Sequence, residues 1–359
     1  MSMFADDSPE LTVILKELDT VKKKARTLKF TELVTCLPAQ VRFRVSKTAA
    51  KTLDVCLQFP IDYPSQMILV EVKSKTLPQK FLDVLSTLID SNKEKILGND
   101  SGQVLAVIRL VIDHIESNPL CVCADEISDI RKMLDLNETG SRNFLKIRQS
   151  KCIVHFLVSA VDYFLEAKIC VPDDYPSTAI TLMVVDSNFP PFFQIYFEAQ
   201  GREIARQCIE PPVTKLKHKN NKSQSQPFEI KPSLLPVASF LIDVVNKYPT
   251  EPCALCKTRC FPVKPDASWT YANIQTEFKR DSQKLLDACS IERVYCSHVY
   301  HNACLDEYMK TPPFPKKCPT CDQIIYHEKW KCSDKTREDR WAHKQAKQRE
   351  LEEVADFLQ

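Results

Sequence analysis

The stretch "LDVCLQFPIDYPSQMILVEVKS", residues 53–74, joins two apolar runs through a proline-rich turn. The stretch "LEAKICVPDDYPSTAITLMVVDS", residues 165–187, repeats the same order. The central tyrosines, Tyr63 and Tyr175, lie 112 positions apart, which is about one domain length. Apolar residues that alternate with period two are typical of strands, and proline fixes a tight turn between them. The sequence therefore predicts two copies of one unit.

Helical patterns open and close each copy. They lie at residues 8–25, 78–97 and 102–117 in the first copy and at 123–136 and 233–248 in the second. Ser8 is the expected cap of the first helix. Residues 33–45 and 144–167 carry further strand patterns before each Tyr-Pro turn. Each unit is thus expected to be an α+β domain with two layers, in which helices cover an antiparallel sheet.

This layout resembles the RWD family, a non-catalytic relative of the ubiquitin-conjugating fold, over residues 5–118 and 122–249. The resemblance rests on the Tyr-Pro turns in "FPIDYPS" and "VPDDYPS" and on the order of the elements. The family usually has another proline four positions later, where this chain has Ile68 and Ile180. The resemblance implies a platform that binds a protein substrate or adaptor. The plainer alternative is that Tyr-Pro only makes a tight turn between strands.

Cysteine use divides the chain. Seven of the 16 cysteines are spread over the first 250 residues, and nine fall between Cys253 and Cys332. The N-terminal "MSMFADDSPE" has no signal-like apolar core, and no apolar run is long enough for a membrane span. We therefore expect a protein of the cytoplasm or nucleus, not secreted, whose thiols bind metal or stay reduced. The net charge of +2 gives no general field that favours nucleic acid or membranes.

A cluster of cysteine and histidine follows the turn-rich "NKYPTEPC". Its members are Cys253, Cys256, Cys296, His298, His301, Cys304, Cys318 and Cys321. Structural zinc takes four such ligands, so these eight predict two zinc ions, and geometry favours sending adjacent pairs to different ions. A PHD-like finger, two sequential zinc ribbons and metal-free buried thiols are the alternatives. Cys260, Cys289 and Cys332 are left over.

Residues 250–330 resemble a RING finger of the kind with two central histidines. The resemblance implies an interleaved arrangement, with Cys253, Cys256, His301 and Cys304 on one zinc ion and Cys296, His298, Cys318 and Cys321 on the other. It also implies a groove for a ubiquitin-conjugating enzyme, contributed by Leu255, Phe314 and Pro319 above the helix at residues 303–310. Such a module has no nucleophile and acts by positioning a loaded conjugating enzyme. Many active members carry Arg or Lys where this chain has Asp322, and an acid cannot donate the same hydrogen bonds.

The combined expectation is a ubiquitin ligase with tandem RWD-like domains and a C-terminal RING finger. The domain order is also similar to that of the Fanconi anaemia complementation group L ligases, whose RING has a shorter first loop. Residues 331–359 form a charged, helix-prone tail, whose apolar cluster from Leu351 to Leu358 could bind a partner. The main alternative is a non-catalytic scaffold with an inactive, zinc-stabilised RING. Nucleic-acid binding is disfavoured, because the sequence lacks a basic, aromatic-rich patch.

Overall fold

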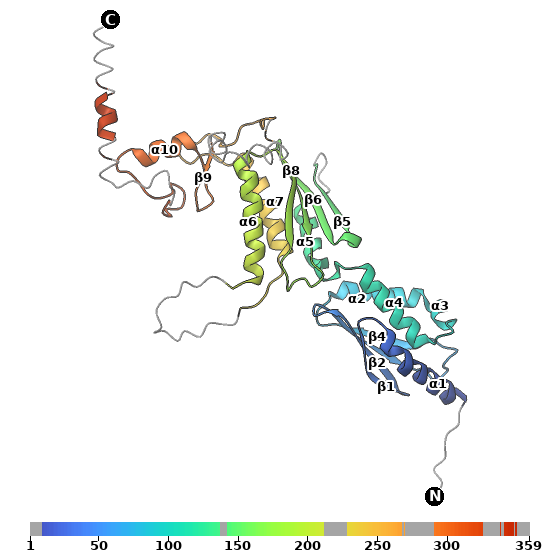
Figure 1. Cartoon of the computed structure of the whole chain (residues 1–359). Coiled ribbons are helices and arrows are strands. Elements are labelled where there is room, and N and C mark those ends of the chain that lie inside the picture. The colour runs from blue at the N-terminus through green and yellow to red at the C-terminus, as the bar shows by residue number, and fades with distance from the viewer. Residues whose placement is uncertain are drawn as a thin grey trace, which may run out of the picture.

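The computed structural model describes residues 9–136, 142–211, 228–267, 269, 291–325, 338, 341–347 and 349. Two α+β units and a smaller C-terminal module follow one another along an elongated molecule (Figure 1). The expected cap Ser8, the cysteines Cys289 and Cys332 and most of the tail at 331–359 lie outside the described residues. Within the tail, residues 341–347 are helical.

The first unit places one four-stranded antiparallel sheet against helices, with strand order β1-β2-β3-β4. Its elements are α1 (Pro9–Lys24), β1 (Thr31–Leu37), β2 (Gln40–Thr48), β3 (Lys51–Gln58), β4 (Leu69–Lys73), α2 (Gln79–Ser91), α3 (Lys93–Leu97) and α4 (Gln103–Ser117). Alternate residues of the central strands, such as Phe43 of β2 and Val55 of β3, are fully buried against the helices. The period-two pattern in the sequence therefore marks the face that packs on the helical layer.

The second unit repeats this arrangement with strand order β5-β6-β7-β8. Its elements are α5 (Ala124–Met133), β5 (Phe144–Arg148), β6 (Ile153–Ala160), β7 (Tyr163–Cys170), β8 (Thr181–Ser187), α6 (Pro191–Ile209) and α7 (Leu234–Lys247). Both units are thus α+β with antiparallel sheets, as the sequence predicts. Helix α6 was not expected. It carries the large aromatic residues Phe193 and Phe197, which are both fully buried.

The two Tyr-Pro turns have the same role in both units. Tyr63 and Tyr175 are buried, and both Tyr-Pro peptide bonds are cis. After each turn the chain is tied to the start of a helix on the other layer. The Ile68 N–H donates to Gln103 at the beginning of α4, at 2.9 Å. The Ile180 N–H donates to the Ser233 hydroxyl just before α7, at 3.3 Å. The repeated motif therefore joins the sheet to the final helix of each unit.

The C-terminal module shares a continuous core with the second unit. It contains β9 (Ile291–Arg293), β10 (Val299–His301) and α10 (Asn302–Lys310). Phe261, which is buried, packs edge-on against Phe193 of α6 and stacks on Tyr248, with ring centroids 5.0 and 6.2 Å away. The Tyr163 hydroxyl of β7 donates to the Pro262 carbonyl at 3.0 Å. The module is therefore anchored to the end of the second unit.

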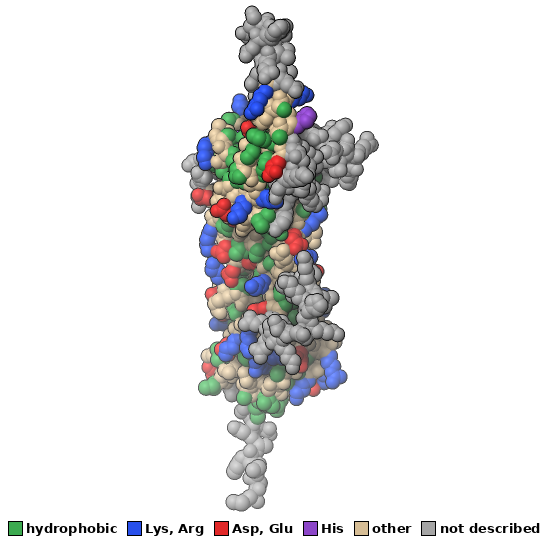
Figure 2. Space-filling view, turned by 90° about the vertical axis from the view of Figure 1, so that its left-hand side faces the viewer, with side chains coloured by type: hydrophobic (Ala, Val, Ile, Leu, Met, Phe, Trp, Pro, Cys, Tyr) green, Lys and Arg blue, Asp and Glu red, His purple; other side chains and the backbone are tan. Residues whose placement is uncertain are grey.

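The surface carries mixed charge. On the face seen in Figure 2, basic and acidic side chains are interspersed over the described part of the molecule, in keeping with the net charge of +2. Among the described residues, the helices are all too short or too polar to cross a membrane.

Candidate metal centre and adjoining groove

Two turns of nearly identical shape present the Cys-x2-Cys pairs. In the first, the Cys253 N–H donates to the Thr258 carbonyl and the Lys257 N–H to the Cys253 carbonyl, both at 2.8 Å. Lys257 has a positive φ of 64°. These bonds fold the backbone so tightly that the two sulfur atoms face the same point. The turn therefore presents two ligands without help from a regular element.

The second turn follows the same pattern. The Cys318 N–H donates to the Gln323 carbonyl at 2.8 Å, and the Asp322 N–H donates to the Cys318 carbonyl at 3.0 Å. Asp322 has a φ of 58°, in the left-handed region that Asp and Asn enter more readily than most residues. Asp322 is exposed, so its local role is to close this turn.

The structure brings the eight expected ligand residues together in two groups. One group is Cys253, Cys256, His301 and Cys304, and the other is Cys296, His298, Cys318 and Cys321. In each group the candidate ligand atoms all lie within 4.8 Å of one another. The groups alternate along the chain, in the interleaved order that the RING resemblance implies. Sequential pairing, as in two zinc ribbons, does not describe this grouping.

Each histidine presents Nδ1 to its group. His301 Nδ1 lies 3.3 Å from Cys256 Sγ and 3.9 Å from Cys304 Sγ. His298 Nδ1 lies 3.3 Å from Cys296 Sγ and 3.6 Å from Cys318 Sγ. His301 Nε2 lies 3.1 Å from the Arg259 carbonyl, which favours a proton on Nε2 and leaves the Nδ1 lone pair toward the sulfur atoms.

Hydrogen-bond donors act on one thiol in each group. Hydrogen bonds from the Thr258 hydroxyl and backbone N–H lower the pKa of Cys256 to about 6. Burial acts to raise the pKa of Cys318, but hydrogen bonds from Tyr300 and from backbone N–H groups outweigh it and lower that pKa to about 7. The Tyr300 hydroxyl, fully buried, lies 3.0 Å from Cys318 Sγ. Both thiols are therefore readily deprotonated, the form in which sulfur binds metals.

Burial and neighbouring sulfur atoms make two other thiols, Cys304 and Cys296, harder to deprotonate. Burial, followed by the adjacent Cys256 and Cys253 sulfur atoms, raises the pKa of Cys304 to about 11. Burial, followed by the adjacent Cys318 and Cys321 sulfur atoms, raises that of Cys296 to about 12, although a backbone N–H opposes this. Several thiolates at such short range repel one another unless a cation lies between them.

The distances fit a tetrahedral ion. With bonds of about 2.3 Å to sulfur and 2.0 Å to nitrogen, tetrahedral ligands would be separated by about 3.5 Å for a sulfur–nitrogen pair. The observed separations of 3.3–3.9 Å bracket that value. Three cysteines and one histidine form a complete four-ligand set for each ion. Each group could therefore hold one metal ion.

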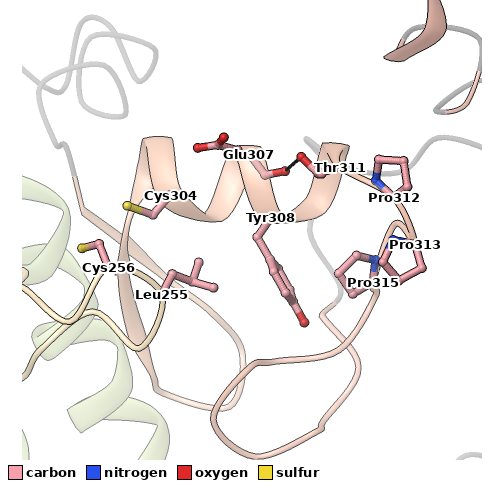
Figure 3. A pocket seen from close by; sticks show the side chains of 9 residues that line it. All are labelled: Leu255, Cys256, Cys304, Glu307, Tyr308, Thr311, Pro312, Pro313 and Pro315. Carbon is pink, nitrogen blue, oxygen red and sulfur yellow. Dashed lines mark hydrogen bonds between the residues drawn. The ribbon is translucent and has the colours of Figure 1, made fainter. Parts of the chain in front are cut away.

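A groove opens beside the first group (Figure 3). It has a volume of about 420 Å³. Leu255 of the first ligand turn and Tyr308 of α10 lie on the same side of that helix. Three prolines lie at the far end of the groove (Figure 3). The remaining lining residues are Cys256, Cys304, Glu307, Thr311, Pro312, Pro313 and Pro315. The cysteines that form the first group thus also fix one wall of an apolar groove.

The three residues expected in a conjugating-enzyme groove have different positions. Leu255, half-buried, lines the groove. Phe314 and Pro319, also half-buried, are not among the described lining residues. Phe314 has a φ of 54° and its N–H closes a turn on the Thr311 carbonyl at 2.8 Å. Because of this turn, the flanking prolines and not Phe314 form the groove wall.

Some residues that shape the site were not foreseen. Tyr300 and Thr258 act on candidate ligand sulfur atoms, and Tyr308 forms part of the groove. Each of the three lies within four residues of a candidate ligand in the sequence, but no spacing pattern singles them out. Cys260, left over in the sequence, is buried beside the first group, and its thiol faces the Val299 carbonyl at 3.5 Å. Cys260 is therefore a packing residue.

Comparison of the chain with models of known protein families and with curated proteins finds no match.

Proposed function

We propose that this protein is a RING-type ubiquitin-protein ligase. In this proposal the two Cys3His groups hold two structural zinc ions, which stabilise the turns of the C-terminal module. The module recruits a ubiquitin-loaded conjugating enzyme, and the two preceding units, as RWD-like domains, recruit a protein substrate or adaptor. The observation that carries the proposal is that the first ligand turn also presents Leu255 to an apolar groove.

The groove supports docking of another protein. Leu255 projects from the loop between two candidate ligands, so its position depends on the first metal group. Tyr308 of α10 lines the same groove, and its hydroxyl donates to the Lys317 carbonyl at 3.3 Å, which links the helix to the second ligand turn. An apolar loop of a conjugating enzyme would lie between these two side chains. Docking would then hold the thioester between ubiquitin and the conjugating enzyme in position for attack by a lysine. The ligase would accelerate this reaction by positioning, without a covalent intermediate of its own.

The α+β units support the recruiting role because their cysteines are packed into the fold and not presented for reaction. All seven of these cysteines are buried or half-buried, and burial raises the pKa of Cys121. Such thiols are packing residues and poor nucleophiles. Two copies of one fold before the module instead supply a long surface on which a substrate can be held.

The test is discharge of ubiquitin from a panel of loaded conjugating enzymes onto free lysine, with the purified full chain. Leu255→Ala removes the apolar contact and is expected to reduce discharge at least tenfold while two zinc ions per chain remain bound. The matched control is Val263→Ala, since Val263 is 65% exposed in the same module and does not line the groove. His301→Ala is expected to lose both zinc and discharge.

The possible results separate ligase from non-ligase. Discharge that falls with Leu255→Ala but not with Val263→Ala would support the groove as the docking site. Discharge that is unchanged in Leu255→Ala would reject that role for the groove. A folded chain with two zinc ions that discharges none of the panel would contradict the ligase proposal.

A scaffold without ligase activity is the second candidate, and Asp322 favours it. This acid stands directly after the last candidate ligand, exposed and in a left-handed turn. A carboxylate there cannot donate hydrogen bonds to a conjugating enzyme and ubiquitin. If the scaffold reading holds, Asp322→Arg would add discharge activity to a chain that otherwise has none.

A further inference from the structure

A second groove lies between the two α+β units. Its lining comes from α2 and α4 of the first unit and from α5 and the end of β5 in the second. Its volume is about 440 Å³, within the range of about 300–1,000 Å³ typical of ligand pockets. Phe81, Leu120 and Ile127 form a buried apolar floor, and Val84 is 57% exposed at this site. The groove therefore offers an apolar surface that both units build.

The charged side chains that line this groove are basic. Lys80 of α2 and Arg131 of α5 both line it, and both are exposed. In the described part of the chain neither forms a salt bridge, and none of the lining residues is Asp or Glu. His114 stacks on Phe81 with ring centroids 4.8 Å apart, and burial lowers its pKa, so its imidazole is neutral near pH 7. Two cations thus flank the apolar floor without an acidic partner.

The C-terminal segment of the chain has the complementary chemistry. The sequence "ELEEVADFLQ", residues 350–359, contains four acidic residues and no Lys or Arg. Leu351, Val354 and Leu358 follow the i, i+3, i+7 spacing of an apolar helical stripe. An acidic segment with an apolar stripe is the kind of ligand that an apolar groove between two cations would bind.

We propose that residues 350–359 of a second copy of this chain dock in the groove between the two units. Figure 1 places the helical residues 341–347 and the helices α2 and α4 toward opposite ends of the molecule. Docking into a second copy satisfies the contact without requiring the tail to cross from one end of its own molecule to the other. Reciprocal docking of two tails gives a closed twofold dimer. The proposal does not depend on ligase activity.

The test measures the mass of the full chain by sedimentation equilibrium over about 1–100 µM, a range that brackets micromolar dissociation constants. The wild-type chain is expected to dimerise, and excess synthetic peptide of residues 350–359 is expected to dissociate the dimer. Lys80→Glu in the groove and Glu353→Lys in the tail should each weaken the dimer at least tenfold. The double variant restores opposite charges and should recover most of the affinity.

Lys93→Glu is the matched control, because it makes the same charge change on α3, outside the groove lining. It should leave the dimer unchanged. A chain that stays monomeric over this range overturns the proposal, as does a dimer that Lys80→Glu leaves intact. A dimer that weakens with Lys80→Glu but not with Glu353→Lys would show another occupant in the groove, and also rejects the tail.

Discussion

The Glu126 carboxylate lies 2.8 and 3.0 Å from the Tyr175 hydroxyl, so the acid at the start of the second unit holds the tyrosine of its Tyr-Pro turn. The same carboxylate accepts the Leu235 N–H at 2.9 Å, and the Tyr175 oxygen accepts the Leu234 N–H at 3.0 Å. In the first unit, Glu17 accepts the Val104 N–H at 2.8 Å. In each unit, an acidic residue of the first helix thus accepts a hydrogen bond from a backbone N–H at the start of the last helix.

Removal of the Glu126 carboxylate should destabilise the second unit. Glu126→Ala leaves the Tyr175 hydroxyl and the Leu235 N–H without their acceptor in a largely buried position. Each unsatisfied group costs about 1–3 kcal/mol, so we expect the free energy of unfolding in urea to fall by roughly 2–6 kcal/mol. Asp129→Ala on the same helix, which removes only an exposed pair with Lys132, is the control and should cost under about 1 kcal/mol. Equal losses in the two variants would contradict this role.

Glu126 should also give the second unit an unusual pH dependence. Burial raises its pKa above the ordinary value of 4.5, although hydrogen bonds from Leu235 and Tyr175 oppose the shift. The folded state then binds a proton more tightly than the unfolded state. The contribution of Glu126 to the free energy of unfolding therefore falls as pH rises from about 4.5 through the raised pKa. We expect the unfolding free energy of wild type, measured relative to Glu126→Gln, to increase as pH is lowered from 7 to about 4.5. A relative stability that decreases as pH is lowered would contradict this role of Glu126.

The repeat and the ligand order were predictable because both are local patterns. Period-two alternation around each Tyr-Pro turn selects the face of the strands that is buried, and the Cys-x2-Cys turns form from their own backbone. Helix α6 was missed for a physical reason. Its aromatic residues and Gly201 are unlike a typical amphipathic helix, yet Gly201 allows close packing, because a Cβ there would lie 2.4 Å from Leu182. Tertiary packing stabilises this helix more than local propensity does.

Contacts between units could not be predicted from the repeat. Asp173 occupies the position that Ile61 holds in the first copy, and Ile61 is 90% exposed. Asp173 instead pairs with Lys51 of the first unit at 2.6 Å. Two equivalent turns therefore have different roles because only one of them faces the other unit. The two-unit groove and the groove beside Leu255 depend on such placements, which spacing along the chain does not encode.

The ion pair of Asp173 should couple the two units. Lys51 is only 1% exposed, and Asp173 accepts from both Lys51 and Lys47, at 2.6 and 3.1 Å. Asp173→Asn would leave a buried ammonium group without its counter-charge, which should lower the free energy of unfolding by about 3 kcal/mol. The loss is smaller to the extent that solvent reaches this partly exposed position. We expect a lower unfolding midpoint and faster proteolysis near residues 118–121. Asp129→Asn, which changes an exposed pair, should alter neither; unchanged proteolysis in Asp173→Asn would show that the units are held by other contacts.

Tyr300 should control one of the two metal groups. Its hydroxyl lies 3.0 Å from Cys318 Sγ and 2.7 Å from the Thr320 hydroxyl. Tyr300→Phe keeps the packed ring but removes the donor to the sulfur, and such partners typically contribute about 10–100-fold in metal affinity. In zinc-loaded protein, we expect one of two zinc ions to transfer at least tenfold faster to a chromogenic chelator. Tyr295→Phe, at an 83% exposed position, is the control. Equal release rates would leave Tyr300 as a packing residue only.

Metal removal should loosen the second unit and spare the first. Phe261 follows the first ligand turn and packs against Phe193 of α6, while the core around α4 belongs to the other unit. After chelation, hydrogen exchange measured by mass spectrometry should therefore rise in α10 and in the first half of α6, with little change in α4. Chelator saturated beforehand with zinc is the control. If exchange in α6 stays at its zinc-loaded level, the module folds independently of the second unit. If exchange in α4 rises as much as exchange in α6, the core of the first unit depends on the metal as well. Either result contradicts the coupling through Phe261.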